Sequence, residues 1–195
     1  MFVQKTVFSF IFCAILFLQS SIYAEIEEVT ITWRAASCDA GCGVLLNKEF
    51  RKIYGVADVQ ISVPEGQATL KWKPNAPITF QSLDTAMHMV GPGMQNLRMK
   101  IKGHIQSTTS GISLVSDGDG TLFPLISTIH PQVNQYTETE SIYNRKLSPD
   151  IQKQLLEIQK SGQSVTIDGP VFEFWNAPPL ILVVEHIKAH EVSVK

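Results

Sequence analysis

The first half of the chain alternates runs of strand-like and helix-like hydrophobic spacing. In residues 28–35, Val29, Ile31 and Trp33 fall on one side and polar residues on the other, which predicts a strand with one buried face. The same period of two predicts strands over residues 57–63, 68–73 and 97–105. Spacings of three and four predict two helices, which carry Leu46, Phe50 and Ile53, and Phe80, Leu83, Met87 and Val90.

Turn residues separate these elements. Gly55 is placed to end the first helix, Pro64-Glu65-Gly66 to reverse the chain, and Gly91 to end the second helix. The predicted order is β-α-β-β-α-β, the split βαβ arrangement of a ferredoxin-like domain. In that arrangement both helices cover one face of a four-stranded antiparallel sheet.

The second half has a different order of predicted strands and helices. The long strand that ends near residue 106 precedes predicted strands over residues 111–116 and 121–127, an irregular stretch over 128–147, and two more strands over 164–174 and 180–189. A helix is predicted between the two strand groups, with Ser148 before it, Pro149 at its first position and Gly162 at its end. Three strands, a helix and two strands is the order of a five-stranded OB-like β-barrel. The predicted fold class is therefore α+β, with the long strand common to both halves.

The N-terminus has the layout of a secretory signal peptide. Lys5 precedes an apolar run over residues 7–18, and small and polar residues follow up to Ala24, a cleavage point. The apolar run is short for a membrane span, which takes roughly 20 residues. An uncleaved anchor is the alternative. We therefore expect a signal peptide over 1–24, a ferredoxin-like domain over 25–98 and an OB-like domain over 99–195.

Charge and cysteine content narrow the function. The 16 basic and 18 acidic residues give a net charge of −2, which argues against nucleic acid as the main ligand. No second apolar stretch is long enough to span a bilayer, so we expect no stable membrane span after signal removal. Export places the chain in the periplasm or outside the cell. Paired cysteines oxidise in those compartments.

Cys38 and Cys42 are the two cysteines beyond the signal segment, in the loop between the first predicted strand and helix. Two thiolates satisfy a soft ion such as Cu(I), and a helix N-terminus favours the thiolate form. Gly41 and Gly43 would let a loop wrap closely around an ion, whereas Asp39 favours the thiol. A disulfide or a redox role uses the same two sulfurs, so the residues alone leave these alternatives open.

The first half resembles the heavy-metal-associated domain family over about residues 28–105. The resemblance is carried by VTITW (29–33), the cysteine loop, IYGV (53–56) and VQISVPEGQATLKW (59–72). It implies a metal-binding function centred on the loop, where the family has Met, one residue and Cys-x-x-Cys. This chain has Ala36 at the methionine position and three residues between its cysteines. In this family's frame the loop after the second helix lies near the metal loop, which makes Met94 an auxiliary ligand candidate.

The second half is similar to small exported OB-fold domains. GHIQS (103–107), LLEIQKSGQSVTIDGPV (155–171) and LILVVEHI (180–187) carry this likeness. It implies a fold rather than a function, because OB barrels bind nucleic acids, sugars, proteins and sometimes metals. A protein partner is the expectation for this half.

The remaining chemistry-bearing residues have structural explanations. Met87, Met99, Trp33 and Trp72 lie on apolar faces and are expected in the core, while His88 and Met89 are expected in solvent. His186 and His190, four strand steps apart, would be ~13 Å from each other, too far to chelate one ion. Asp117 and Asp119 fit a hairpin turn rather than a calcium loop.

These observations predict an exported protein that is not an enzyme, since no catalytic triad, carboxylate dyad or phosphate loop stands out. The expected ligand is a soft metal ion bound by Cys38 and Cys42, Cu(I) first and Hg(II) or Zn(II) as alternatives. The competing prediction is an envelope interaction module in which the two cysteines form a disulfide.

Overall fold

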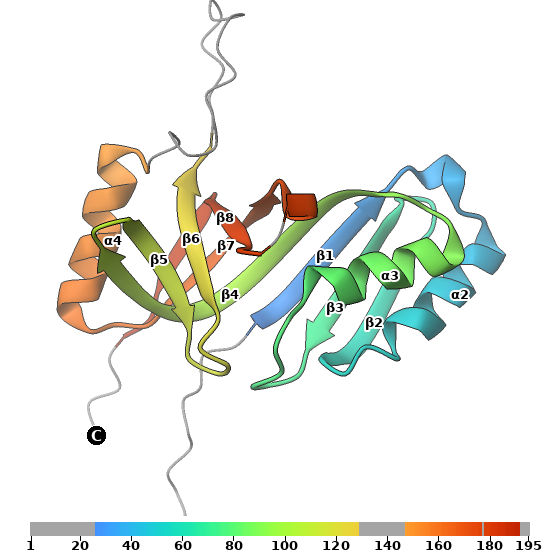
Figure 1. Cartoon of the computed structure of the whole chain (residues 1–195), viewed down its shortest axis with the longest axis horizontal. Coiled ribbons are helices and arrows are strands. Elements are labelled where there is room, and N and C mark those ends of the chain that lie inside the picture. The colour runs from blue at the N-terminus through green and yellow to red at the C-terminus, as the bar shows by residue number, and fades with distance from the viewer. Residues whose placement is uncertain (1–25, 129–146, 177, 192–195) are drawn as a thin grey trace, which may run out of the picture.

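The structure is a computed structural model that describes residues 26–128, 147–176 and 178–191 (Figure 1). The predicted signal peptide over residues 1–24 lies outside the described residues. So does most of the irregular stretch predicted between the third strand of the second half and its helix.

Strands make up the larger part of the regular secondary structure in the described chain. They are β1 (Ile26–Trp33), β2 (Val56–Ser62), β3 (Gln67–Trp72), β4 (Met94–Thr108), β5 (Gly111–Ser116), β6 (Leu122–Ser127), β7 (Val165–Phe172), β8 (Ile181–Val184) and β9 (His186–Ala189). The helices are α2 (Ala40–Phe50), α3 (Phe80–Val90) and α4 (Pro149–Ser161), with short 3-10 turns η2 (Ala35–Ser37) and η4 (Phe174–Asn176). The α+β class and the predicted element order are confirmed.

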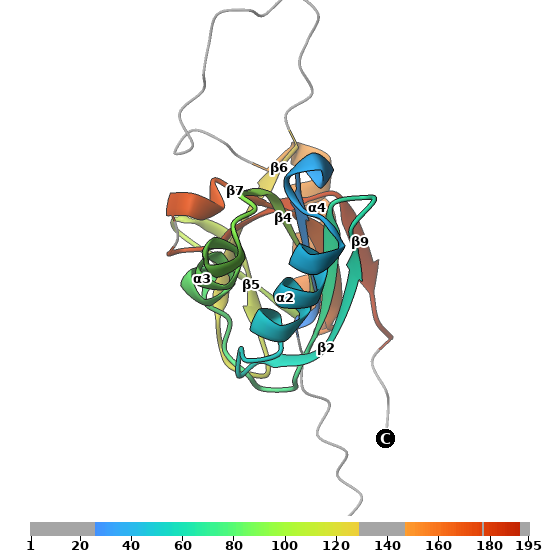
Figure 2. The same cartoon turned by 90° about the vertical axis from the view of Figure 1, so that its right-hand side faces the viewer.

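The N-terminal part is a βαββαβ unit. Its strands pair in the order β2-β3-β1-β4, all antiparallel, and Ile31 of β1 stands opposite Ala68 on one side and Leu97 on the other. Helices α2 and α3 lie beside each other on one face of this sheet (Figure 2). This is the arrangement that the hydrophobic periods predicted.

The space between sheet and helices is a closely packed apolar core. Leu46 of α2, Leu83 and Met87 of α3, and Ile31 and Leu97 of the sheet are all fully buried. Trp33, Trp72 and Met99 are also buried, as predicted.

Strand β4 continues beyond the first unit into the second. Its residues 98–101 pair with β1 on one edge and β7 on the other, and residues 103–108 pair with β5. The pairings β4-β5-β6-β8-β7-β4 form a closed ring of five strands, in which β6 and β8 are parallel. Figure 1 shows β4 crossing the molecule between the two parts. The expected boundary between residues 98 and 99 therefore falls inside one continuous strand.

The helix of the second part begins and ends where its capping residues predicted. The Ser148 side chain accepts a hydrogen bond from the N–H of Ile151, Pro149 is the first helical residue, and Gly162 follows the helix with a positive φ of 67°. Ser148 satisfies a backbone N–H of the first turn, Pro149 stands where no N–H donor is needed, and Gly162 tolerates the left-handed conformation that ends the helix.

The last predicted strand, over residues 180–189, is divided in two. Its register against β7 shifts by one residue between the pairs Val171–Leu182 and Asp168–His186, which leaves Glu185 as the extra residue of a bulge. Gly169 of β7 lies at this point, and a Cβ there would stand 1.7 Å from the Val183 carbonyl oxygen. The absence of a side chain at Gly169 permits the close approach. The preceding strand ends at Phe172, two residues earlier than predicted, because η4 follows.

Candidate functional site

Cys38 and Cys42 are joined by a disulfide at the start of α2. Their Cα atoms are 5.3 Å apart. Cys38 follows η2 just outside the helix, and Cys42 lies in the first helical turn. The loop between β1 and α2 thus brings the two sulfurs together, as either a metal clamp or a disulfide requires.

Asp39 fixes the start of the helix between the two cysteines. Its Oδ1 accepts a hydrogen bond from the backbone N–H of Cys42 at 2.8 Å, the geometry of an N-cap. The helix consequently begins at Ala40, so that Cys42, which was expected in the loop, belongs to the first helical turn. An aspartate in this position offsets the partial positive charge of the helix end at the place where a thiolate would benefit from it.

The two glycines of the loop have a different role from the one expected. Gly41 and Gly43 are helical, so they do not wrap around a bound ion. A Cβ on Gly43 would lie 2.5 Å from Cγ2 of Val63, which follows β2. Gly43 therefore lets the first turns of α2 approach the sheet.

The two sulfurs belong to residues of different exposure. Cys38 is 7% exposed and is part of the hydrophobic core, whereas Cys42 is half-buried at its edge. Reagents in solution therefore reach Cys42 more readily than Cys38.

Gly66, with a φ of 61°, accepts a hydrogen bond from the N–H of Trp33 on its carbonyl oxygen and holds the end of β1 just before the loop.

Met94, the auxiliary ligand candidate, lies at the same end of the sheet as the loop. It is the first residue of β4, stands opposite Trp33 of β1, and is half-buried against the core. This position is compatible with a third ligand, and the role itself stays a prediction.

The other candidate ligands are explained structurally, as the sequence indicated. Met87 and Met99 are fully buried, and Met89 is 72% exposed. His88 is exposed and bonds back to Asp84 one helical turn earlier. Asp119 accepts from the backbone N–H of Thr121 within the turn between β5 and β6, which confirms a hairpin turn.

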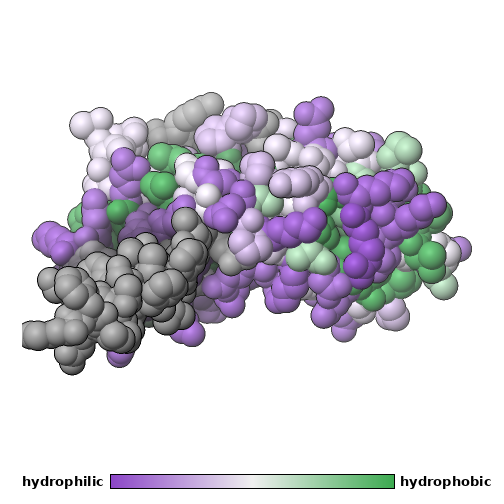
Figure 3. Space-filling model, turned by 90° about the horizontal axis from the view of Figure 1, so that it is seen from below, coloured by the Kyte–Doolittle hydropathy of each residue, from purple (hydrophilic) through white to green (hydrophobic). Residues whose placement is uncertain are grey.

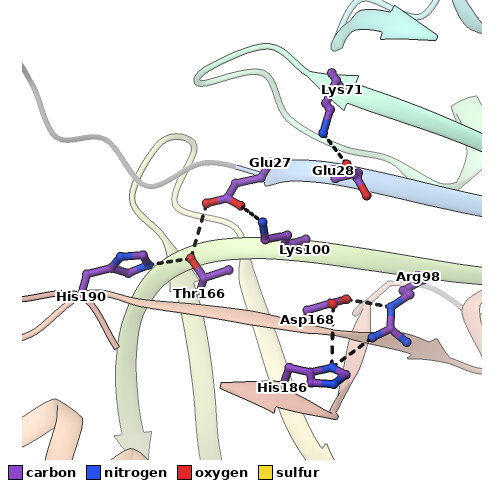
Figure 4. Close-up of polar contacts among 9 residues, drawn as sticks. All are labelled: Glu27, Glu28, Lys71, Arg98, Lys100, Thr166, Asp168, His186 and His190. Atoms are coloured by element: carbon purple, nitrogen blue, oxygen red, sulfur yellow. Dashed lines mark hydrogen bonds and ion pairs between the residues drawn. The ribbon is translucent and has the colours of Figure 1, made fainter. Parts of the chain in front are cut away.

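A polar network on the open face of the sheet was not predicted. Arg98 of β4 contacts Asp168 and His186, and Glu27 of β1 reaches Lys100 and Thr166 (Figure 4). Arg98 also contacts Glu185. His190 in turn bonds Thr166 at 2.8 Å. Apart from the His190–Thr166 pair, which is 24 positions apart, these contacts join residues 70 to 139 positions apart, and local patterns do not reveal them.

The donor set of the loop suits a narrow class of ions. Within the described ranges, no three His, Cys, Asp or Glu side chains form a group that could hold a metal. Two sulfurs alone suit a two-coordinate soft ion such as Cu(I), whereas zinc in proteins takes four ligands or three and water. Reduction must come first, because each sulfur of the disulfide is already bonded to the other.

The helices of the described residues include none with the length and hydrophobicity that a membrane span requires.

The fold and the loop together define a βαββαβ unit with a cysteine pair between its first strand and first helix. No family model matches the chain, and no curated protein matches it either. Among solved structures, its N-terminal part is similar to heavy-metal-associated domains over about a third of the chain. One is the yeast copper transporter domain Ccc2a, solved in apo and Cu(I)-loaded states, with 19% identity, a TM-score of 0.31, and coverage of 35% of this chain and 92% of that one. Another is oxidised MerP from Ralstonia metallidurans CH34, with 24% identity, a TM-score of 0.32, and coverage of 36% and 96%.

Proposed function

We propose that this chain is an exported, non-catalytic binding protein for a soft metal ion, with Cu(I) as the preferred ion. Cys38 and Cys42, in their reduced form, are the ligands, and Met94 is an auxiliary one. The observation that carries the proposal is the convergence of the two sulfurs where β1 passes into α2, with Cα atoms 5.3 Å apart. Soft thiolates select Cu(I) over hard ions.

Export is supported by two independent features. The apolar segment over residues 7–18 fits a signal peptide, and an oxidised cysteine pair fits a compartment in which disulfides persist. In such a compartment the bound ion and the disulfide compete for the same sulfurs, so the redox state decides whether the site is open.

We propose that the ring of five strands is an OB-type domain and that this domain contacts a protein partner. Its pairing order, the parallel β6–β8 pair and the placement of α4 between the third and fourth ring strands match the OB order. In this proposal the ring is a docking or modulating part and β4 connects it to the metal loop.

A second candidate function is favoured by the disulfide itself. If the bridge is permanent, the first unit is an interaction module that has lost metal binding. A local bridge stabilises a fold weakly, at about 2 kcal/mol for a five-residue loop in the chain-entropy description, so stability alone gives little reason for it.

Titration of the purified protein distinguishes the two functions. Thiols are counted before and after reduction, and Cu(I) is then added in competition with a chromophoric chelator. We expect one equivalent of Cu(I) on the reduced protein, and none on the oxidised protein or on Cys38→Ser/Cys42→Ser. A reduced wild type that takes up no Cu(I), or a double variant that still binds one equivalent, would rule out the metal site.

A further inference from the structure

The outward side of the first two turns of α2 is apolar and uncovered. We call this surface, formed by Ala40, Gly41, Val44 and Leu45, the outer α2 face; all four residues are exposed, Val44 at 71% and Leu45 at 51%. Figure 3 shows green hydrophobic surface at the end of the molecule that carries α2. The opposite side of the helix supplies Leu46 and Phe50 to the core, so folding does not explain the exposed apolar pair.

The outer α2 face adjoins the disulfide. Leu45 is three residues after Cys42, and residues three apart on a helix are neighbours on its surface. Charged side chains on α2 begin only at Lys48, after the two apolar turns. A partner that covers this face would therefore meet a disulfide at its margin.

We propose that the outer α2 face is the docking surface for a protein dithiol that reduces the Cys38–Cys42 bridge. The inference rests on the proposed function, because only the reduced pair can bind a metal ion. A protein partner fits better than a small thiol, since an apolar surface of several side chains gains free energy only when a comparable surface covers it.

The chemistry of this step follows from the unequal exposure of the cysteines. A thiolate of the partner attacks Sγ of Cys42, the more exposed residue of the pair, and Cys38 leaves as a thiolate that takes up a proton. The second thiol of the partner then displaces Cys42. The partner ends as a disulfide, and the chain gains two electrons and two protons as two thiols.

Reduction kinetics test the docking surface. The oxidised protein is reduced either by thioredoxin, regenerated with its reductase and NADPH, or by dithiothreitol, and the appearance of thiols is followed over time. In Val44→Gln/Leu45→Gln we expect reduction by thioredoxin to slow at least tenfold and reduction by dithiothreitol to stay within twofold. The control is Met89→Gln on α3, an apolar residue as exposed as Val44, which should leave both rates unchanged.

Equal slowing with both reductants, no slowing with thioredoxin, or the same slowing in Met89→Gln would overturn the proposal. The point of attack is tested with a thioredoxin that lacks its second active-site cysteine, so that the mixed disulfide persists. Peptide mapping should find the adduct on Cys42, and an adduct on Cys38 would contradict the assignment.

The outcome is separable from the metal hypothesis. Cu(I) binding is measured on protein that has been reduced chemically, without any docking partner. Val44→Gln/Leu45→Gln should then bind Cu(I) like the wild type, so a failure of docking and a failure of metal binding give different results.

Discussion

Arg98 on β4 donates its Nε–H to Oδ1 of Asp168 on β7 at 2.8 Å, and its Nη1 pairs with Glu185 at the bulge between β8 and β9. The hydrogen bond to Asp168 raises the pKa of Arg98 above its ordinary value. One guanidinium thus joins three chain segments that are distant in sequence, at the place where the N-terminal sheet meets the strand ring.

Replacing Arg98 with Met should destabilise the protein by about 1–2 kcal/mol, because two partly buried carboxylates lose their shared partner. All three side chains are 31% exposed, so solvent screens part of the effect. Urea unfolding measures the change. Lys71→Met is the control, since it removes a more exposed pair with Glu28 and should cost about 0.5 kcal/mol. Equal losses in the two variants would contradict the central role of Arg98.

Two substitutions of Asp39 test its helix-capping role and its charge beside the cysteines separately. Asp39→Asn keeps the acceptor for the Cys42 N–H and should leave stability nearly unchanged, whereas Asp39→Ala should cost about 1 kcal/mol. In reduced protein, Asp39→Asn also removes a negative charge beside the thiols and should increase the rate of alkylation by iodoacetamide at pH 7. Slower alkylation in Asp39→Asn would show that the carboxylate does not oppose the thiolate.

Gly66 supports the strand that leads into the loop. Its φ of 61° is costly for other residues, and a Cβ would stand 2.3 Å from the Trp33 carbonyl oxygen and 2.9 Å from the Ala35 nitrogen. Gly66→Ala should therefore destabilise by at least about 2 kcal/mol, a fall in Tm of roughly 4–8 °C for a chain of this size. Gly93→Ala, where a Cβ has open space and φ is ordinary, should shift Tm by less than about 2 °C.

His190 makes stability depend on pH. Partial burial, followed by the positive charges of Lys102 and Lys188, lowers its pKa below 6.5, against the opposing effect of Glu27. The unfolded chain therefore binds the proton more readily than the folded one. Stability is fully present above pH 6.5 and falls as the pH drops from 6.5 to the lower folded pKa. Urea unfolding between pH 5 and 8 should show a smaller acid loss in His190→Gln than in the wild type.

Local patterns predicted most of the fold because its elements carry their own start and stop signals. Ser148, Pro149 and Gly162 delimit α4, and alternation at Val29, Ile31 and Trp33 defines the buried side of β1. The bulge at Glu185 escaped prediction because its cause, the bare backbone of Gly169, lies on a different strand. The periodicity of a strand does not report what its neighbour permits.

The candidate site was predicted as a position rather than as a chemical state. The spacing of Cys38 and Cys42 placed both sulfurs in one loop, and the structure brings them together as a disulfide. Sequence reasoning assigned Gly41 and Gly43 to the loop because the pattern of large apolar residues starts only at Leu45 and Leu46. The Asp39 side chain, three residues before Cys42, was the available signal that the helix starts earlier.

The shared strand β4 restricts how this architecture could be divided or exchanged. Residues 98–101 bond to β1 on one edge and to β7 on the other, so a break in this segment removes a strand from both parts. A gene fusion that transplanted either part alone would have to duplicate residues 94–108, and each copy would expose an edge that the original molecule keeps paired. Neither part can therefore be removed or recombined without taking a strand from the other, so the two parts are inherited together.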